Sequence, residues 1–359
     1  MDKKKKYSHL TAFLGNACNL NCSYCYLRTA GRQKIKERNF LSAIIYFIKN
    51  SPEDRKITFL GGEPLCNPLL FKKAVMIARK IAPDIPLRLF TNGTLLTREL
   101  LDFINSRGIE LSISLDGKKE CNDFSRKFRN SEGSVFDAVT EKLPAEKRAG
   151  ATVGIVVRPD TAELLTDNIE ALLELGFRNI GWTPDITAMW TEEDIFRLES
   201  AAADLYGIYI KELKKKRVLF TVANIYETLE DILSEEREDG CGSLTLDCSG
   251  KFYPCDKLLC ATVKTRNRYR IRRERDGFSQ TGSKQFFAAA RRDGTEPART
   301  ACPVGPWAVS KFSRIEGTGG KEFMAGQLLL CKIVRNWLAS IASEGIRYKE
   351  FLHAHNMEQ

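Results

Sequence analysis

Three cysteines lie close together near the start of this 359-residue chain, as Cys18-x3-Cys22-x2-Cys25 within NACNLNCSYCYL. Thiolates at these spacings can converge on one metal centre, and three of them can hold three irons of a four-iron cubane. The fourth iron then has no protein ligand. The motif therefore predicts an iron–sulfur site with one open position, to which another molecule could bind directly.

Two other interpretations of these cysteines stay open at this point. Zinc usually takes two spaced pairs of ligands that close a tetrahedron, and here only three cysteines are grouped. The thiols could also be small buried hydrophobic groups, which is a common role of a single cysteine. Three cysteines at fixed spacing, in a chain with 11 cysteines, favour the iron–sulfur site over both alternatives.

The composition is typical of a folded protein, with 43% hydrophobic and 28% charged residues. No run approaches the roughly 20 apolar residues of a membrane span, and the N-terminal MDKKKKYSHL has no signal-peptide core. We therefore expect a cytoplasmic protein without a membrane partner, in which thiols stay reduced. The histidines His9, His353 and His355 form no plausible hydrolytic triad.

Short β-rich runs alternate with segments of helical period over the first two thirds of the chain. Strands are predicted near residues 8–15, 57–60, 86–91, 110–115, 151–158 and 178–183. Helices are predicted near residues 38–50, 68–82, 96–107, 132–146, 161–175 and 191–216. Repeated strand–helix units imply a parallel α/β sheet, and six in succession favour a partial (β/α)6 barrel with its chemistry at the carboxyl ends of the strands.

The pattern changes after about residue 217, which predicts a barrel domain over residues 1–216 and a smaller, cysteine-rich α+β domain over residues 217–359. The second domain is expected to start with a helix in VANIYETLEDILSEE, followed by two short strands and a turn in CGSLTLDCSGKFYPCDKLLC. Residues 261–300 are polar and basic and are expected to form a long loop. Helical period returns from KEFMAGQLLLCKIVRNWLASIA.

Much of the formal charge of +10 lies between Asp256 and Arg299, where 12 Lys and Arg residues face five Asp and Glu residues. The densest part is KTRNRYRIRRER, residues 264–275. This segment is either a solvated surface or a dock for an acidic peptide, and nucleic acid is the weaker option.

The cysteine motif, placed after the first predicted strand, resembles the radical S-adenosylmethionine (SAM) superfamily, whose hallmark is CxxxCxxC in a partial (β/α)6 barrel. The resemblance implies a [4Fe–4S] cluster on Cys18, Cys22 and Cys25, with SAM bound at the open iron. An electron from a donor such as flavodoxin or ferredoxin would then cleave SAM to a 5′-deoxyadenosyl radical.

Two further motifs fit the same ligand. GGEP, with Gly61, Gly62 and Glu63, follows the second strand and resembles the segment that holds the methionine amine of SAM, because glycines allow close approach and a carboxylate accepts from an ammonium group. A strand-ending turn is its other interpretation. Tyr24 stands where the family places an aromatic side chain near the adenine, and ordinary packing is the alternative.

The segment SISLDGKKECNDFSR, residues 112–126, resembles the family segment in which a serine and an arginine bind the methionine carboxylate. The matching residues are Ser114 and Arg126, and a planar guanidinium can pair with both oxygens of a carboxylate. The alternative for Arg126 is a surface ion pair. Many relatives have histidine where Asn122 stands in this chain.

Cys241, Cys248 and Cys255 lie in a segment that resembles the opening of the SPASM or Twitch domain, and Gly250-x4-Cys255 matches its signature. The resemblance implies one auxiliary [4Fe–4S] cluster on these three cysteines. A structural zinc ribbon is the alternative.

The remainder of the SPASM cysteine pattern is broken in this chain. The fourth ligand of the auxiliary cluster is left open among Cys260, Cys302 and Cys331, or no protein ligand at all. Cys66 and Cys121 have no partner spacing and are expected to be small buried hydrophobic groups.

Asp256 directly follows Cys255, and in the anaerobic sulfatase-maturing relatives an aspartate at this place takes a proton from the substrate. A turn-capping aspartate is the other interpretation. The resemblance as a whole implies an enzyme that abstracts a hydrogen atom from a peptide or protein, in maturation of a ribosomally synthesised peptide by a thioether or other cross-link. Formylglycine formation, nucleic-acid modification and a non-catalytic iron–sulfur protein that binds a partner are the alternatives.

Overall fold

The computed structural model of the chain describes residues 7–28, 30, 33–214, 221–222, 242–293, 311, 333 and 336–337. Nine strands form one sheet in the order β7-β6-β5-β4-β3-β2-β1-β8-β9. Neighbouring strands are parallel except for the β8–β9 hairpin. The strands are β1 (His9–Phe13), β2 (Lys56–Leu60), β3 (Leu87–Thr91), β4 (Ile109–Ser114), β5 (Thr152–Val157), β6 (Asn179–Pro184), β7 (Thr221–Val222), β8 (Ser243–Leu246) and β9 (Phe252–Tyr253).

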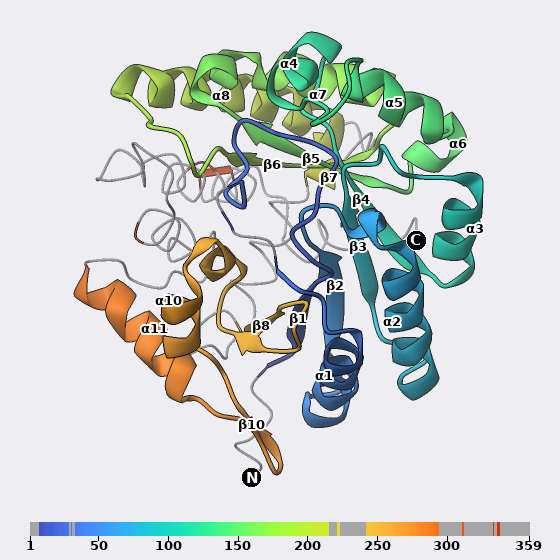
Figure 1. The fold of residues 1–359 in the computed structure, drawn as a ribbon. Coiled ribbons are helices and arrows are strands. Elements are labelled where there is room, and N and C mark those ends of the chain that lie inside the picture. Colours follow the sequence, from blue (N-terminus) through green and yellow to red (C-terminus); the bar gives the residue numbers. More distant parts are fainter. Residues whose placement is uncertain are drawn as a thin grey trace.

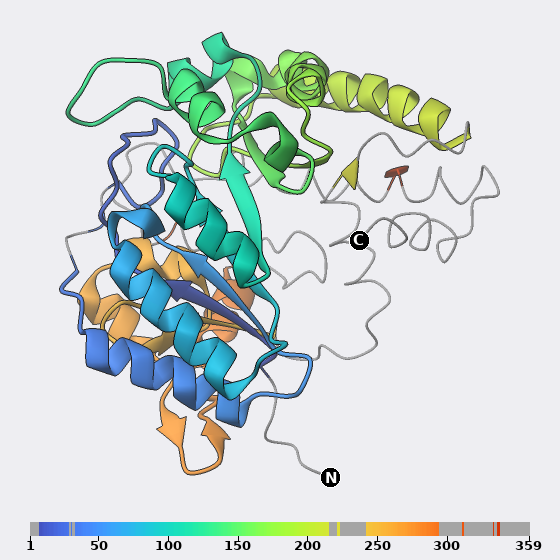
Figure 2. The same ribbon diagram turned by 90° about the vertical axis from the view of Figure 1, so that its right-hand side faces the viewer.

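Helices cover the outer face of this curved sheet (Figure 1, Figure 2). The sheet and these helices together form the expected partial barrel. The helices of the barrel are α1 (Glu37–Asn50), α2 (Pro68–Ile81), α3 (Arg98–Ser106), α4 (Lys119–Ser125), α5 (Val135–Lys142), α6 (Ala145–Arg148), α7 (Leu165–Glu174) and α8 (Glu192–Lys214), with the 3-10 helices η1 (Pro64–Cys66) and η2 (Pro159–Leu164). Among the described residues, no helix combines the length and the apolarity needed to cross a membrane.

Local sequence explains where these helices begin and which face they bury. In α1 the buried residues Phe40, Ala43, Ile44 and Phe47 recur at helical spacing and form one apolar face. The Asn67 side chain caps α2 by accepting from the Leu70 N–H at 3.3 Å, and Pro68 occupies the first helical position. The start of α2 and the buried face of α1 thus follow from the local sequence.

The sequence-based predictions for the barrel are confirmed for all six strands, within one or two residues at each end. The helix predicted over 132–146 is split into α5 and α6, and the one predicted over 161–175 begins with η2. The short helix α4 was not predicted. The helix predicted in VANIYETLEDILSEE is wrong at its first residue, because Val222 ends β7, and the rest of it lies outside the described residues.

The expected long loop over residues 261–300 is wrong for the part that the structure describes. This part forms α10 (Val263–Arg268), the β10 (Arg273–Glu274) and β11 (Gly277–Phe278) hairpin, and α11 (Thr281–Arg292), after the 3-10 helix η3 (Asp256–Cys260). Buried aromatic side chains hold it in place: Phe278 makes edge contacts with Tyr7 and Tyr46, and Phe286 is fully buried. The loop was predicted from the many arginines of this segment, and its few apolar residues gave too weak a pattern to predict helices or strands.

The cysteine-rich segment packs directly on the barrel. β8 pairs with β1 in parallel, and an apolar cluster joins Phe13 of β1 and Leu27 to Leu258 and Phe286. The predicted boundary at residues 216/217 therefore has strands of one sheet on both sides, since β7 pairs with β6 and β8 with β1.

Gly250 in the β8–β9 turn is required for this packing. Its φ is +87°, and a Cβ atom there would lie 2.7 Å from the Asn39 carbonyl oxygen of α1.

We expect Gly250→Ala to lower the free energy of unfolding by at least the roughly 1–3 kcal/mol of backbone strain. Urea unfolding followed by circular dichroism measures it. Gly207→Ala in α8, where the added Cβ meets nothing within 4 Å, is the control and is expected to leave stability equal or higher; equal losses in both variants contradict the prediction.

Candidate active site

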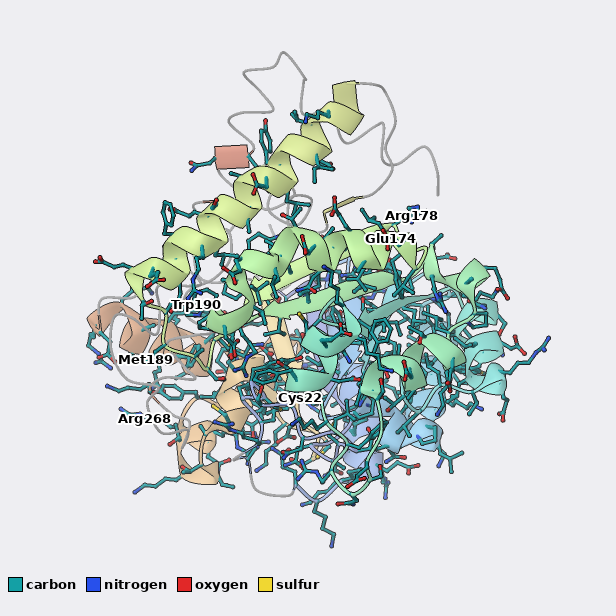
Figure 3. All side chains as sticks on the ribbon, turned by 90° about the horizontal axis from the view of Figure 1, so that it is seen from above. Cys22, Glu174, Arg178, Met189, Trp190 and Arg268 are labelled. Carbon is teal, nitrogen blue, oxygen red and sulfur yellow. The ribbon has the colours of Figure 1, made fainter. Side chains whose placement is uncertain are left out.

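One cavity of about 1130 Å³ collects most of the residues that the sequence singled out. It opens at the carboxyl ends of the strands, where a barrel of this kind carries its chemistry. In Figure 3, Cys22 lies near the middle of the molecule, whereas the exposed Met189 and Arg268 lie nearer its edge. The predicted site residues in its lining are Cys18, Cys22, Tyr24, Cys25, Gly61, Gly62, Glu63, Ser114, Arg126, Cys255 and Asp256.

The three thiols of the cysteine loop lie close enough to influence one another electrostatically. Burial raises the pKa of Cys18 to about 12 and that of Cys22 to about 11, and the neighbouring thiols add to both shifts. The Leu20 N–H donates to Cys18 Sγ at 3.3 Å. Shielded thiolates that repel one another need a cation to hold them, so the donor set fits a metal cluster.

Among the described residues, no three His, Cys, Asp or Glu side chains are grouped as ligands of a single metal ion. A cubane differs, because each thiolate binds a different iron and the sulfurs do not meet at one ion. The arrangement of Cys18, Cys22 and Cys25 around one cavity is compatible with that requirement.

The glycines of GGEP make room for the cysteine loop. The Gly62 N–H donates to the Gly15 carbonyl oxygen at 2.9 Å, and the Glu63 N–H donates to the Ala17 carbonyl oxygen at 2.8 Å. A Cβ atom at Gly61 would lie 2.7 Å from the Gly15 oxygen, and one at Gly62 would lie 2.5 Å from the Ala17 oxygen. Only residues without a side chain fit here, so the motif sets the path of the cysteine loop.

The Glu63 carboxylate is almost fully buried, and it already accepts three hydrogen bonds. Oε1 accepts from the Leu65 N–H at 2.9 Å and from the Thr91 hydroxyl at 2.7 Å, and Oε2 accepts from the Asn92 N–H at 2.7 Å. A carboxylate has about four acceptor positions, so about one is left for the expected ammonium group. Glu63 therefore ties the ends of β2 and β3 together as well as lining the cavity.

The TNGT segment, residues 91–94, follows β3 and bonds to the cysteine loop. Asn92 Nδ2 donates to Asn19 Oδ1 at 2.9 Å, Asn19 Nδ2 donates to the Thr94 hydroxyl at 2.8 Å, and that hydroxyl donates to Asn92 Oδ1 at 2.7 Å. This closed ring of hydrogen bonds joins the cysteine loop to the end of β3.

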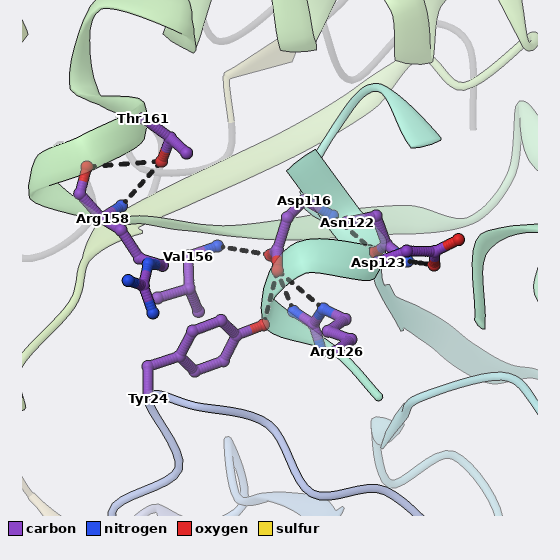
Figure 4. A network of polar contacts seen from close by, with 8 residues as sticks. All are labelled: Tyr24, Asp116, Asn122, Asp123, Arg126, Val156, Arg158 and Thr161. Atoms are coloured by element: carbon purple, nitrogen blue, oxygen red, sulfur yellow. Dashed lines mark hydrogen bonds and ion pairs between the residues drawn. The ribbon is translucent and has the colours of Figure 1, made fainter. Parts of the chain in front are cut away.

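A second buried carboxylate, Asp116, is the centre of the network drawn in Figure 4. Arg126 donates to it through Nε and Nη2, both at 2.9 Å, and the two side chains are only 6% and 5% exposed. The Tyr24 hydroxyl donates at 2.6 Å and the Val156 N–H at 2.9 Å. Four donors thus fill the four acceptor positions of this carboxylate.

This network changes the expected roles of its members. Arg126 was expected to pair with a ligand carboxylate through two guanidinium nitrogens. Nε and Nη2 already pair with Asp116, so Nη1 is the nitrogen left for a ligand. The Tyr24 ring lies 5.3 Å from the Arg126 guanidinium, so Tyr24 orients Arg126 in addition to lining the cavity. Asn122 is fully buried, and its Oδ1 accepts from the Asp116 N–H at 3.2 Å.

The cysteine-rich segment reaches the same cavity through Asp256. Its Oδ2 accepts from the Tyr26 hydroxyl at 3.0 Å and from Lys257 Nζ at 2.6 Å, and Lys257 lies 4.6 Å from the centre of the Tyr26 ring. Burial alone would raise the pKa of Asp256, but the Lys257 ammonium and the hydrogen bond from Tyr26 together lower that pKa. Since Tyr26 directly follows Cys25, this hydrogen bond joins the two cysteine-bearing loops.

The structure does not bring all predicted cysteines to the cavity. Cys248 is fully buried, with Sγ 3.5 Å from Gln33 Oε1, and Cys260 is buried with its thiol donating to the Lys257 carbonyl oxygen at 2.9 Å. The predicted residues Cys241, Cys302 and Cys331 lie outside the described residues.

The expectation of buried thiols at Cys66 and Cys121 is wrong. Cys66 is exposed and Cys121 is half-buried. Cys66 ends η1 beside the cavity, where the chain turns away from the sheet before α2.

Sequence reasoning also missed Asp116, Tyr26 and Lys257. Asp116 lies inside the SLDG segment that was singled out, and an acidic residue ten positions before Arg126 was the available signal. Nothing in the sequence pairs Tyr26 with a residue more than 200 positions away.

The buried pair gives a stability prediction. We expect Asp116→Ala to lower the free energy of unfolding by about 3–5 kcal/mol, because it leaves the Arg126 charge buried without a partner. Asp167→Ala is the matched control, since Asp167 pairs with Lys118 on the surface, where water screens both charges. Urea unfolding of the two variants measures the difference, and similar small losses would show that Asp116 does not stabilise the fold.

The chain is similar in sequence to known proteins. An uncharacterised protein of Methanocaldococcus jannaschii is 30% identical over 219 residues, which are 58% of this chain and 75% of the relative. The serine-type anaerobic sulfatase-maturating enzyme of Klebsiella aerogenes is 26% identical over 272 residues, which are 69% of this chain and 66% of the relative.

Solved structures share the fold. Native anSMEcpe with bound AdoMet and the Cp18Cys peptide superposes with a TM-score of 0.69 at 18% identity, over 94% of this chain and 99% of that one. Streptococcus suis SuiB bound to the precursor peptide SuiA superposes with a TM-score of 0.50 at 15% identity, over 69% of this chain and 59% of that one.

A family model described as the radical SAM superfamily matches residues 13–205, from the first strand into α8. This range holds the cysteine loop, GGEP and the Asp116 network. The chain therefore belongs to the radical SAM superfamily, and it is an enzyme whose cofactors are a [4Fe–4S] cluster and SAM.

Proposed function

We propose that this enzyme reductively cleaves SAM and abstracts a hydrogen atom from a peptide or protein substrate. The observation that carries the proposal is the single cavity of about 1130 Å³ whose lining joins the three cysteines to Glu63, Arg126 and Asp256. A cavity of this size can hold SAM and a substrate side chain together.

Each part of the lining has a distinct task in this proposal. Cys18, Cys22 and Cys25 would hold three irons, and the remaining acceptor position of Glu63 and the Nη1 of Arg126 would bind the amine and carboxylate of SAM. When bound, the cluster and SAM supply a 5′-deoxyadenosyl radical. The protein fixes the geometry beforehand, because both carboxylates are buried and hydrogen-bonded, Glu63 by three donors and Asp116 by four.

A peptide substrate is supported by the names of similar proteins. The sulfatase-maturating relative and the peptide-bound anSMEcpe and SuiB structures act on or bind polypeptides. We propose maturation of a ribosomally synthesised peptide by a thioether or other cross-link, because the cysteine pattern after Cys255 is incomplete compared with that of sulfatase maturases. Asp256 is proposed to accept the substrate proton, on the strength of its place in the cavity lining.

Formylglycine formation is the second candidate reaction. Two observations favour it: the 26% identity to the serine-type sulfatase-maturating enzyme over 272 residues, and the presence of Asp256 beside Cys255 in the cavity. One auxiliary cluster held by Cys241, Cys248 and Cys255 would serve either reaction by taking up an electron.

The first test is SAM cleavage. Anaerobic reconstitution and reduction of the full-length chain, followed by addition of SAM, are expected to yield 5′-deoxyadenosine, and Cys22→Ala is expected to reduce it to the level of unreconstituted protein. The electron paramagnetic resonance signal of the reduced cluster is expected to change when SAM is added. Cys121→Ala, which alters a half-buried cysteine outside the cavity lining, is the control. Zinc instead of iron at the site, or a signal that SAM leaves unchanged, contradicts the proposal.

The second test separates the two candidate reactions. A synthetic serine-type sulfatase peptide that loses two hydrogens, about 2 Da by mass spectrometry, with SAM cleavage would establish formylglycine formation as the reaction. SAM cleavage without conversion of that peptide favours cross-linking of a different substrate.

A further inference from the structure

A second cavity, of about 480 Å³, lies outside the active-site cavity and carries strong positive charge. Three segments border it: the start of α1, the β8–β9 turn and residues 270–273. Figures 1 and 2 both show the β10–β11 hairpin beside α1, and the Tyr46 hydroxyl of α1 donates to the carbonyl oxygens of Glu274 and Gly277. We call this cavity the basic groove; its cationic residues are Lys36, Lys251, Arg270, Arg272 and Arg273.

The described residues do not neutralise the charge of the basic groove. No acidic residue is in its lining, and within the described part of the chain no ion pair involves its five cations. Glu37, the acidic residue beside Lys36, pairs with Lys73 at 2.6 Å. The groove thus concentrates like charges, which is unfavourable without an anion and attracts one from solution.

Arg273 lines the groove, and ring contacts and hydrogen bonds hold its guanidinium. Its guanidinium lies 5.2 Å from the Tyr46 ring and 5.5 Å from the Phe252 ring, and it donates to the Ser42 hydroxyl and the Gly250 carbonyl oxygen, both at 3.4 Å. A guanidinium fixed in this way loses little freedom when a carboxylate pairs with it.

The groove and the active-site cavity share two segments of chain. Gln33 and Ile35 line the cavity and Lys36 lines the groove, while Cys255 lines the cavity and Lys251 the groove. A peptide bound in the groove therefore contacts two chain segments that also line the active-site cavity.

We propose that the basic groove binds an acidic segment of the peptide substrate, whose Asp and Glu side chains pair with Arg270, Arg272 and Lys251. This inference rests on the proposed function, since it gives the peptide substrate a place and a chemistry for recognition. Carboxylates match the guanidinium fork, and several pairs together give affinity and direction.

Nucleic acid fits the groove less well. Proteins that bind single strands combine positive charge with aromatic rings on which bases stack. Here Phe252 is buried, and the guanidinium of Arg273 lies over both Phe252 and Tyr46.

Fluorescence anisotropy with the full-length chain tests this proposal. The probe is a fluorescein-labelled Glu-Gly repeat peptide, and a Gln-Gly repeat of equal length and a labelled poly(U) RNA are compared with it. We expect the Glu-Gly peptide to bind, to weaken as salt is added, and to lose about tenfold or more in affinity with Arg270→Glu/Arg272→Glu, because two attractive pairs become repulsive. Arg291→Glu/Arg292→Glu, at the exposed end of α11, changes the same charge elsewhere and is the matched control.

Two further measurements make the outcome decisive. A Lys-Gly repeat peptide is expected to bind the Arg270→Glu/Arg272→Glu variant better than the unmodified chain, which a misfolded variant would not do. Equal losses in the groove and control variants, or RNA binding that is tighter and depends on the same arginines, would overturn the proposal. 5′-Deoxyadenosine formation by the unmodified chain is measured separately. SAM cleavage without peptide binding refutes only the proposal that the groove binds the peptide. Peptide binding without SAM cleavage refutes only the proposed function.

Discussion

Close backbone contact between the cysteine loop and the end of β2 is the constraint on which the active site depends. Gly61 and Gly62 leave no room for side chains, because carbonyl oxygens of the loop occupy the space where a Cβ would stand. Hydrogen bonds from Gly62, Glu63 and Asn92 then hold the loop, and the buried side chains of Leu20 and Leu27 add apolar contacts. The position of the three thiols is therefore fixed by the backbone.

Two buried carboxylates connect the strand ends that surround the cysteine loop. Glu63 joins the ends of β2 and β3, and Asp116 joins the end of β4 to β5, α4 and the cysteine loop. Each is costly to bury and is compensated by three or four donors, so the loss of any one donor weakens the others. These hydrogen bonds leave about one acceptor position on Glu63 and none on Asp116 for a ligand, which restricts how a ligand can be oriented there.

The sequence allowed the barrel and most of the cavity lining to be predicted, because alternation and helical period are local properties and the carboxyl ends of parallel strands meet at one edge. It did not allow the partners of Arg126 or Glu63 to be predicted, since a charged side chain that can bind a ligand can equally bind a neighbour from another strand. Arginine-rich residues 264–275 hid a hairpin whose stability comes from a few aromatic contacts distant in sequence, above all those of Phe278.

The pairing of β8 with β1 has a consequence for how such a chain can change during evolution. Residues His9 to Ala12 of β1 find half of their sheet partners in Ser243 to Leu246, contributed from more than 200 positions further along the chain. Without that strand, β1 would present a bare, apolar edge of the kind that joins with other copies into aggregates. The cysteine-rich segment thus covers the edge of the barrel sheet. A lineage that loses the cysteines of this segment still has a physical reason to retain β8.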